Sequence, residues 1–216
     1  MADRTNIEKF EELLLSVKRD GMDKLIEFIR KSDFYTAPAS TRYHLAVAGG
    51  LLEHSLHVAE CLFNKLNNPI WEKKIGDVGR DTLIIVSLLH DVCKTYNYGQ
   101  ELKNQKTYDV DKVEAVKNKN PREVKRDTNG EFIWETVPVY VTDDKYPLGH
   151  GNKSVYFIMQ YIRLDMQEIA AITHHMGAYC DSSQWTTLGN AYEKWPLALA
   201  LHQADLEATY LMESEK

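Results

Sequence analysis

Two adjacent side chains that can bind a metal ion follow one of the most apolar segments of the chain. His90 and Asp91 come directly after the run LIIVSLL at 83–89, which is typical of a buried helix. A carboxylate that leaves water costs free energy unless a cation pairs with it. A bound metal ion would satisfy Asp91, but a capping aspartate beside a core histidine explains this pair alone equally well.

Two further candidates lie on helical segments. His54 belongs to the run LLEHSLHVAECLFNKL at 51–66, where it shares the inward face with Val58, whereas His57 points outward and is expected to be solvated. Asp205 lies on a mainly apolar helical face near the end of the sequence, so it also needs a partner. Singly, each of these residues is explained equally well as a hydrogen-bonded core residue.

Two more candidate metal ligands are a histidine between two glycines and one member of a histidine pair. His150 stands between Gly149 and Gly151, which allow the backbone to approach other groups closely. His174 and His175 end a helical run. Adjacent helical residues point ~100° apart, so the spacing leaves open which of the two faces a common site.

These residues are hard to explain together as accidents of core packing. Two inward carboxylates and three or four imidazoles on four helices and a loop predict a shared metal site, and such ligands suit Zn, Fe, Mn and similar ions. Ligation without cysteine argues against a structural zinc site. The three cysteines, Cys61, Cys93 and Cys180, form no pairing motif, which indicates a reducing compartment rather than a disulfide framework.

The elements that must position these residues are mostly helical. Apolar residues recur at helical spacing over 5–18, over a second helix ending before the turn at 36–38, and over 51–66, 81–94, 153–163, 165–175 and 195–212. The stretch 96–147 is polar and lysine-rich, and Asn129-Gly130 precedes the alternating run FIWETVPVYV. This pattern predicts a small β-hairpin, in which Pro138 indicates an edge strand. An irregular loop is expected over 177–188.

Composition excludes several classes of protein. The chain of 216 residues carries a net charge of −6, so binding to duplex nucleic acid is not expected. Its longest apolar stretch, 83–89, is too short to cross a bilayer. The first twenty residues are charged throughout and lack the apolar core of a signal peptide. We therefore expect a cytoplasmic protein without membrane partners, while its oligomeric state cannot be inferred.

The order His54, His90-Asp91, Asp205 resembles the signature of the HD-domain metal-dependent phosphohydrolase superfamily. The flanking segments GGLLEHSLHVA at 49–59 and SLLHDVCK at 87–94 carry the likeness, and PLGHGNKS, ITHHMGA and LALALHQADLEATYL are similar to small HD hydrolases of bacteria and their phages. The resemblance spans about 42–212. It implies an all-α fold, a single HD-domain helical bundle over 1–216, to which N-terminal helices at 1–40 and the β-hairpin insertion at 96–147 are added.

The resemblance also implies a ligand set. The first metal would be held by His54, His90, Asp91 and Asp205. Asp91 would bridge to a second metal, completed by His150 and His175; His175 is preferred to His174 because relatives carry a His-Met-Gly-Ala run. One or two divalent ions are expected, chosen from Mn, Fe, Co, Ni, Zn and Mg.

The chemistry implied is hydrolysis of a phosphoester of a nucleotide or related small phosphorylated substrate. A divalent ion lowers the pKa of a water that it binds, and thereby supplies a nucleophile near neutral pH. Asp91 and Lys94 are the predicted catalytic residues, and cationic support for the phosphate is expected from Lys94, Lys153 and Arg42. Two alternatives stay open. One is a 3′–5′ exonuclease on single strands, with the lysine-rich stretch 112–125 as a lip; the other is a nucleotide-sensing module without turnover.

Overall fold

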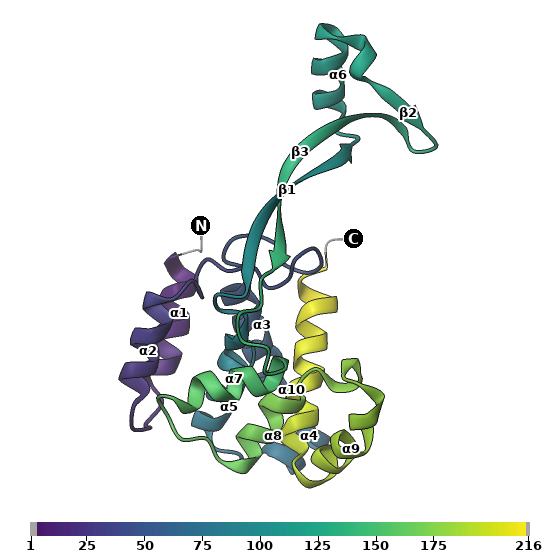
Figure 1. Ribbon diagram of the computed structural model, residues 1–216. Helices are drawn as coiled ribbons and strands as arrows, with labels where there is room; N and C mark the ends of the chain where they lie inside the picture. The colour runs from purple at the N-terminus through teal and green to yellow at the C-terminus, as the bar shows by residue number, and fades with distance from the viewer. Residues whose placement is uncertain (1–3, 215–216) are drawn as a thin grey trace. The chain divides into compact units, whose positions relative to one another are not determined.

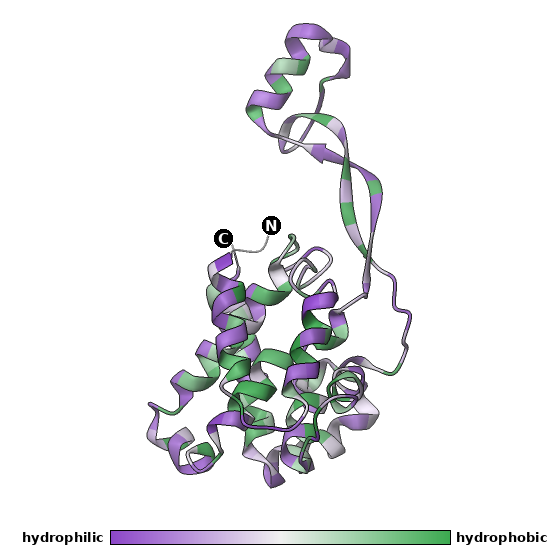
Figure 2. Cartoon of the chain, turned by 90° about the vertical axis from the view of Figure 1, so that its left-hand side faces the viewer, coloured by the Kyte–Doolittle hydropathy of each residue, from purple (hydrophilic) through white to green (hydrophobic). Residues whose placement is uncertain are grey.

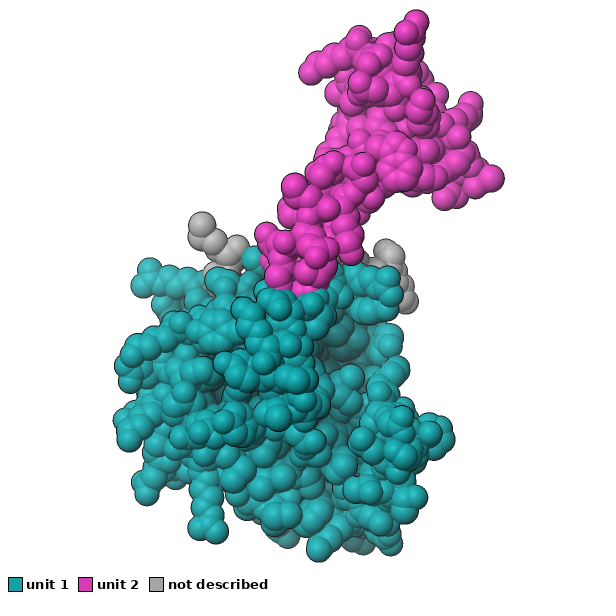
Figure 3. Space-filling model, viewed as in Figure 1, with its two compact units in different colours: residues 1–98, 142–216 teal, residues 99–141 magenta. Residues whose placement is uncertain are grey.

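The computed structural model describes residues 4–214. They are mostly helical with one small sheet (Figure 1). The chain divides into two compact units, residues 1–98 with 142–216 and residues 99–141 (Figure 3). The second unit falls within the segment 96–147 that the sequence predicts as an insertion. All of the predicted metal ligands belong to the first unit.

The first unit is built from helices. They are α1 (Arg4–Leu15), α2 (Met22–Lys31), α3 (Gly50–Lys65), α4 (Pro69–Ile75), α5 (Arg80–Leu89), α7 (His150–Met159), α8 (Met166–His174), α9 (Trp185–Lys194) and α10 (Pro196–Glu207). Short 3-10 helices at Val92–Lys94, Gly177–Tyr179 and Ser182–Gln184 and a π-helical turn at Ala208–Met212 complete it.

Helix α5 lies at the centre of the core. Its residues from Thr82 to Leu89 are all buried, as expected of a helix that is apolar on nearly every side. Helix α3 packs against both α5 and α10, and α8 packs against α7 and α10. Figure 2 shows that the hydrophobic residues of this unit concentrate on its inner helices. The ends of α5 and α8 are thereby buried, and His90, Asp91 and His175 lie at these ends.

A buried ion pair fixes the start of α8. Asp165 caps the helix by accepting from the backbone N–H of Glu168, whose own carboxylate accepts from the N–H of Asp165, a capping box. The same Glu168 carboxylate takes two hydrogen bonds from the Arg19 guanidinium at 2.7 and 2.8 Å and one from Thr82 at 2.8 Å. These contacts join the loop after α1, the first turn of α5 and α8.

The second unit holds a three-stranded sheet, one α-helix and a short 3-10 helix at Pro121–Glu123. Strands β1 (Tyr98–Thr107), β2 (Lys125–Asp127) and β3 (Gly130–Thr142) lie in the order β1-β3-β2, and α6 (Val110–Lys119) follows β1. Strands β2 and β3 are antiparallel, with Lys125 opposite Phe132 and Asp127 opposite Gly130. A hairpin therefore forms where the sequence predicts one, but its two turn residues are Thr128 and Asn129, because Gly130 already pairs with Asp127 as the first residue of β3.

Three details of this architecture differ from the sequence predictions. The lysine-rich stretch forms α6, which Asp109 caps by accepting from the N–H of Lys112. Helix α9 occupies 185–194, where its first residues were expected to be loop. Pro138 was expected on an edge strand, but it lies on β3, which is central in the order β1-β3-β2. Because β2 pairs only with residues 130–132, Pro138 lies beyond the part of β3 that β2 covers. Within residues 4–214, no helix has both the length and the hydrophobicity to span a membrane.

Candidate metal centre

The fold brings all six predicted ligands to one place. His54 comes from the second turn of α3, His90 and Asp91 directly follow α5, His150 begins α7, His175 directly follows α8 and Asp205 lies near the end of α10. Figure 1 shows these helices. These ligands form overlapping groups in which one donor atom from each residue lies within 4.8 Å of the others: His54 with His90 and Asp205, His90 with Asp91 and His175, and Asp91 and His150 with the sulfur of Cys93.

Two histidines are oriented by the helices that they end. Nδ1 of His90 lies 2.8 Å from the carbonyl oxygen of Ser87, and Nδ1 of His175 lies 2.7 Å from that of Ile172. Each carbonyl accepts, so each Nδ1 carries a proton, and Nε2 of each ring is turned toward the cluster. His174 is half-buried and stays outside these groups, so the structure places His175 rather than His174 at the centre.

His54 is held from both sides by carboxylates. Its Nδ1 lies 3.1 Å from both oxygens of Glu213, and its Nε2 lies 3.2 Å from Asp205 Oδ1 and 3.3 Å from His90 Nε2. Burial favours the neutral ring, but the hydrogen bonds to Asp205 and Glu213 outweigh it and raise the pKa of His54 to about 9. The metal-free ring is therefore protonated, and its positive charge pairs with the two carboxylates.

The two oxygens of Asp91 face different histidines. Oδ1 lies 2.6 Å from Nε2 of His150 and 3.4 Å from Nε2 of His175. Oδ2 lies 3.5 Å from Nε2 of His90 and 3.6 Å from Nε2 of His54. Burial opposes ionisation, but Lys94 and the surrounding imidazoles hold the pKa of Asp91 well below its usual range. The carboxylate is thus charged and lies between two pairs of imidazole nitrogens.

This arrangement fits a divalent cation. His175 is fully buried, and its Nε2 makes no well-formed hydrogen bond among the described residues, although Asp91 Oδ1 lies 3.4 Å away, so this desolvated nitrogen is only weakly compensated. The donors are imidazole nitrogens and carboxylate oxygens, a set suited to Zn, Fe, Mn and related ions. Burial raises the pKa of the neighbouring Cys93 thiol to about 12, so this residue is protonated and a poor ligand.

Glu213 is the buried carboxylate that the sequence interpretation missed. It accepts from Nδ1 of His57 at 2.9 Å as well as from His54, and its side chain is fully buried. The prediction that His57 is solvated is therefore wrong, because this ring is mostly covered and hydrogen-bonded. The only signal in the sequence was the spacing of eight residues from Asp205, which repeats one helical face.

The three predicted phosphate-binding cations have different surroundings. Lys94 lines the pocket beside the cluster, with its ammonium 2.6 Å from Asp91 Oδ2. Lys153 is buried elsewhere, because its ammonium binds Asp144 at 2.7 Å and Asn97 at 2.9 Å. Arg42 is exposed, and its guanidinium donates to the hydroxyl of Tyr43 at 2.8 Å. Of the three, Lys94 alone is among the lining residues.

A pocket of about 1030 Å³ opens onto the cluster. Asp91, His150, His175 and Asp205 contribute to its wall, together with the loop at 43–47 and residues 206–214. His202 also lines it, and its Nδ1 donates to the carbonyl oxygen of His175 at 2.6 Å. The pocket thus has the size of a small-molecule site with convergent polar groups at one end.

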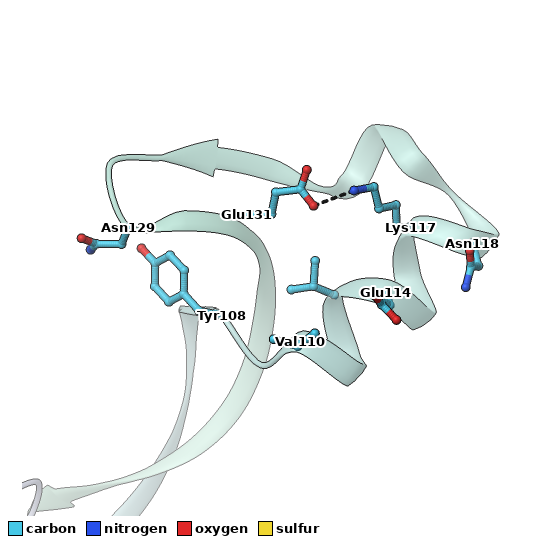
Figure 4. Close-up of a pocket in the computed structure, with 8 residues that line it drawn as sticks. Tyr108, Val110, Glu114, Lys117, Asn118, Asn129 and Glu131 are labelled. Carbon is cyan, nitrogen blue, oxygen red and sulfur yellow. Dashed lines mark hydrogen bonds and ion pairs between the residues drawn. The ribbon is translucent and has the colours of Figure 1, made fainter.

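A second hollow, of about 630 Å³, belongs to residues 99–141 (Figure 4). It is bordered by Tyr108, Val110 and the first turns of α6, and by the ion pair of Lys117 with Glu131 at 2.7 Å. None of its lining residues belongs to a group of potential metal ligands found among residues 4–214. The chemistry of the molecule is therefore to be sought in the first unit.

Comparison with known proteins gives one partial likeness. The chain is similar to a dihydroneopterin 2′,3′-cyclic phosphate phosphodiesterase from Methanocaldococcus jannaschii, with 40% identity over 62 residues. The match covers 29% of this chain and 24% of the relative, so the chain spans about a quarter of the length of that curated protein. No protein-family model matches the chain. No solved structure matches it significantly.

Proposed function

We propose that the chain is a metal-dependent phosphohydrolase of the HD-domain class that hydrolyses a phosphoester of a nucleotide or a related small molecule. The observation that carries the proposal is Asp91, whose two oxygens face His150 and His175 on one side and His54 and His90 on the other. The partial likeness to a protein named as a cyclic phosphate phosphodiesterase supports the same reaction class.

Each side chain has a part in this proposal. His54, His90, Asp91 and Asp205 would hold one divalent ion, and Asp91, His150 and His175 a second. Such ions lower the pKa of a bound water and draw charge from a phosphoryl oxygen. Lys94, which lines the pocket, neutralises charge on the phosphoryl oxygens. In the net reaction one water adds to phosphorus, the P–O bond to the leaving group breaks, and the leaving oxygen takes up a proton.

Replacement of Asp91 tests the proposal. We expect Asp91→Ala and Asp91→Asn to lose bound metal after gel filtration, measured by mass spectrometry of the metals, and to lose phosphoester hydrolysis, measured after reloading with Mn²⁺. The control Asp143→Ala removes an exposed aspartate that lies 3.6 Å from Lys145, and it should retain both properties. Circular dichroism should show the same helical signal in all variants.

Other outcomes would change the assignment. Full activity or full metal content in Asp91→Ala would refute the site. A progressive ladder from a labelled oligonucleotide would favour the exonuclease alternative. Tight binding of a nucleotide with metal present, and no turnover, would favour a sensing module.

A further inference from the structure

The pocket beside the metal centre has two chemically different ends. The cluster of histidines and aspartates occupies one end. The remaining wall is formed largely by apolar and aromatic residues from three segments: the loop at 43–47, the segment 176–179 that contains a 3-10 helix, and residues 206–210, where α10 passes into the π-helical turn. A substrate whose phosphoryl group lies at the cluster must place the rest of its body against this wall.

Exposed aromatic rings lie on this wall. Tyr179 is 66% exposed and Tyr210 57% exposed, and their hydroxyls are 3.4 Å apart. Tyr43 and Val47 on the loop at 43–47 are also exposed. Large apolar side chains that gather around the mouth of a pocket, instead of being scattered singly, mark a binding surface. Tyrosine rings bind planar groups by stacking, and their hydroxyls can bond to polar edges of those groups.

Positive charge in the pocket is confined to the cluster end. Among the lining residues, all of which the structure describes, Lys94 is the only lysine or arginine, whereas three are carboxylates: Asp91, Asp205 and Glu213. Lys94 is already 2.6 Å from Asp91. Lys153 is bound to Asp144, and the Arg42 guanidinium lies over the Tyr43 ring at 5.0 Å. A second or third phosphate would therefore lie against tyrosines and aliphatic side chains, and no lysine or arginine that lines the pocket is free to pair with it.

We infer that the substrate carries a single phosphoryl group, as a monoester or a cyclic diester, on a planar ring body that packs against Tyr179 and Tyr210, and that polyphosphates are rejected. This inference rests on the proposed function, because the cluster must be where the phosphoester is hydrolysed. Water adds to phosphorus and the ester P–O bond breaks. A monoester then yields inorganic phosphate and an alcohol, and a cyclic diester yields a monoester.

Two matched substrate series test the inference on the full chain loaded with Mn²⁺. The first keeps the ring constant and adds phosphates: adenosine 2′,3′-cyclic phosphate, AMP, ADP and ATP. We expect kcat/KM to be at least about tenfold higher for one of the two single-phosphoryl compounds than for ADP or ATP. The second series compares benzyl phosphate with ethyl phosphate, which share an alkyl leaving oxygen and differ in the ring. Here benzyl phosphate should have the lower KM.

Variants of the wall connect this preference to the tyrosines. Tyr179→Ala and Tyr210→Ala should each raise KM for benzyl phosphate about fivefold, with KM for ethyl phosphate unchanged. The control Tyr156→Ala removes a tyrosine that is 50% exposed on α7 and does not line the pocket, and it should change neither value. Preference for ADP or ATP, or unchanged KM values in both variants, would overturn the inference and leave the proposed function intact. A metal-loaded chain that hydrolyses none of these compounds would overturn both.

Discussion

The carboxylate of Glu213 lies 3.1 Å from Nδ1 of His54, a residue 159 positions earlier in the chain. The two side chains meet because α10 packs along α3 and the π-helical turn at Ala208–Met212 follows α10 directly. Both are buried. The contact uses the ring nitrogen that faces away from the cluster, so Nε2 remains directed at Asp205 and His90. Such a carboxylate orients a metal-binding imidazole and increases its basicity.

Removal of this carboxylate should weaken the metal site without removing a ligand. We expect Glu213→Gln to lower Mn²⁺ affinity about 10- to 100-fold, the usual effect of losing a partner of a metal-bound histidine. Isothermal titration calorimetry measures the change. The control Glu193→Gln alters an exposed glutamate on α9 and should bind Mn²⁺ as the unmodified chain does. Equal affinities in both variants would show that Glu213 serves packing alone.

Metal uptake should depend on pH because His54 carries a proton in the metal-free protein. Its pKa is raised to about 9, and metal binding at Nε2 requires that the proton leave. Affinity should therefore rise by up to about tenfold per pH unit below pH 9 and level off above it. Calorimetry in two buffers of different ionisation enthalpy at pH 7.5 should detect the release of about one proton per ion from this ring. Affinity that does not change with pH would contradict the assignment.

The stability of the metal-free protein should change with pH in the opposite sense. A raised pKa in the folded state means that protonated His54 stabilises the fold fully below its ordinary value of 6.5. This contribution is lost as the pH rises through about 9. Thermal unfolding of chelator-treated protein should therefore show a falling Tm between pH 6.5 and 9. The same scan with saturating Mn²⁺ should show a smaller fall or a rise, since bound metal stabilises the folded state.

The contrast between Asp91 and Glu213 shows what the sequence could and could not reveal. His90-Asp91 follows a run of seven residues that are all apolar except Ser87, and burial of that run forces any charge at its end to find a partner. Helical spacing likewise identifies the inward face of His54. Glu213 lies among the polar residues that end the chain, and its burial depends on how α10 docks onto α3. Local pattern carries no information about that docking.

The positions of charged residues in the sequence did not predict which lysines line the pocket or how the lysine-rich stretch folds. Lys153 lies in the glycine-flanked segment that begins α7, yet Asp144, nine residues earlier, pairs with it. The lysine-rich stretch predicted to be irregular forms α6, where Lys112 and Lys117 reach Glu135 and Glu131 on β3. In both cases the partner comes from a loop or strand whose position follows from tertiary structure. The hairpin between β2 and β3 was predictable from the turn residues near Asn129-Gly130, although the turn itself lies one residue earlier, at Thr128-Asn129.

The ion pair between Arg19 and Glu168 should matter more to stability than any exposed pair. The Glu168 side chain is fully buried, and removal of the guanidinium leaves that carboxylate without its counter-charge. Arg19→Met should lower the free energy of unfolding by about 3 kcal/mol, measured by urea denaturation. Arg4→Met removes a pair with Glu8 in which both side chains are largely exposed, and the change should stay below about 0.5 kcal/mol. If both substitutions lower the free energy of unfolding by the same amount, the buried pair contributes no more to stability than the exposed one.

A close backbone approach near the site lies at Gly151, directly after His150. A Cβ atom at this position would lie 2.5 Å from the carbonyl oxygens of Ile172 and Thr173 in α8. Backbone atoms within a helix cannot yield as the tip of a flexible side chain does. Gly151→Ala should therefore separate α7 from α8 and destabilise the fold by about 1–3 kcal/mol. Because His150 and His175 lie at these two helix ends, Mn²⁺ affinity should fall as well.

A second glycine on a helix serves as the control for this prediction. Gly189 in α9 has no atom within 4 Å of the position of an added Cβ, so Gly189→Ala should raise helix propensity and stabilise the fold by up to about 1 kcal/mol. Urea denaturation and Mn²⁺ titration of the two variants separate packing from propensity. Opposite signs in stability, with metal affinity reduced in Gly151→Ala alone, would establish that the contact of α7 with α8 holds His150 and His175 in register. An unchanged metal affinity in a destabilised Gly151→Ala would show that the two histidines do not depend on it.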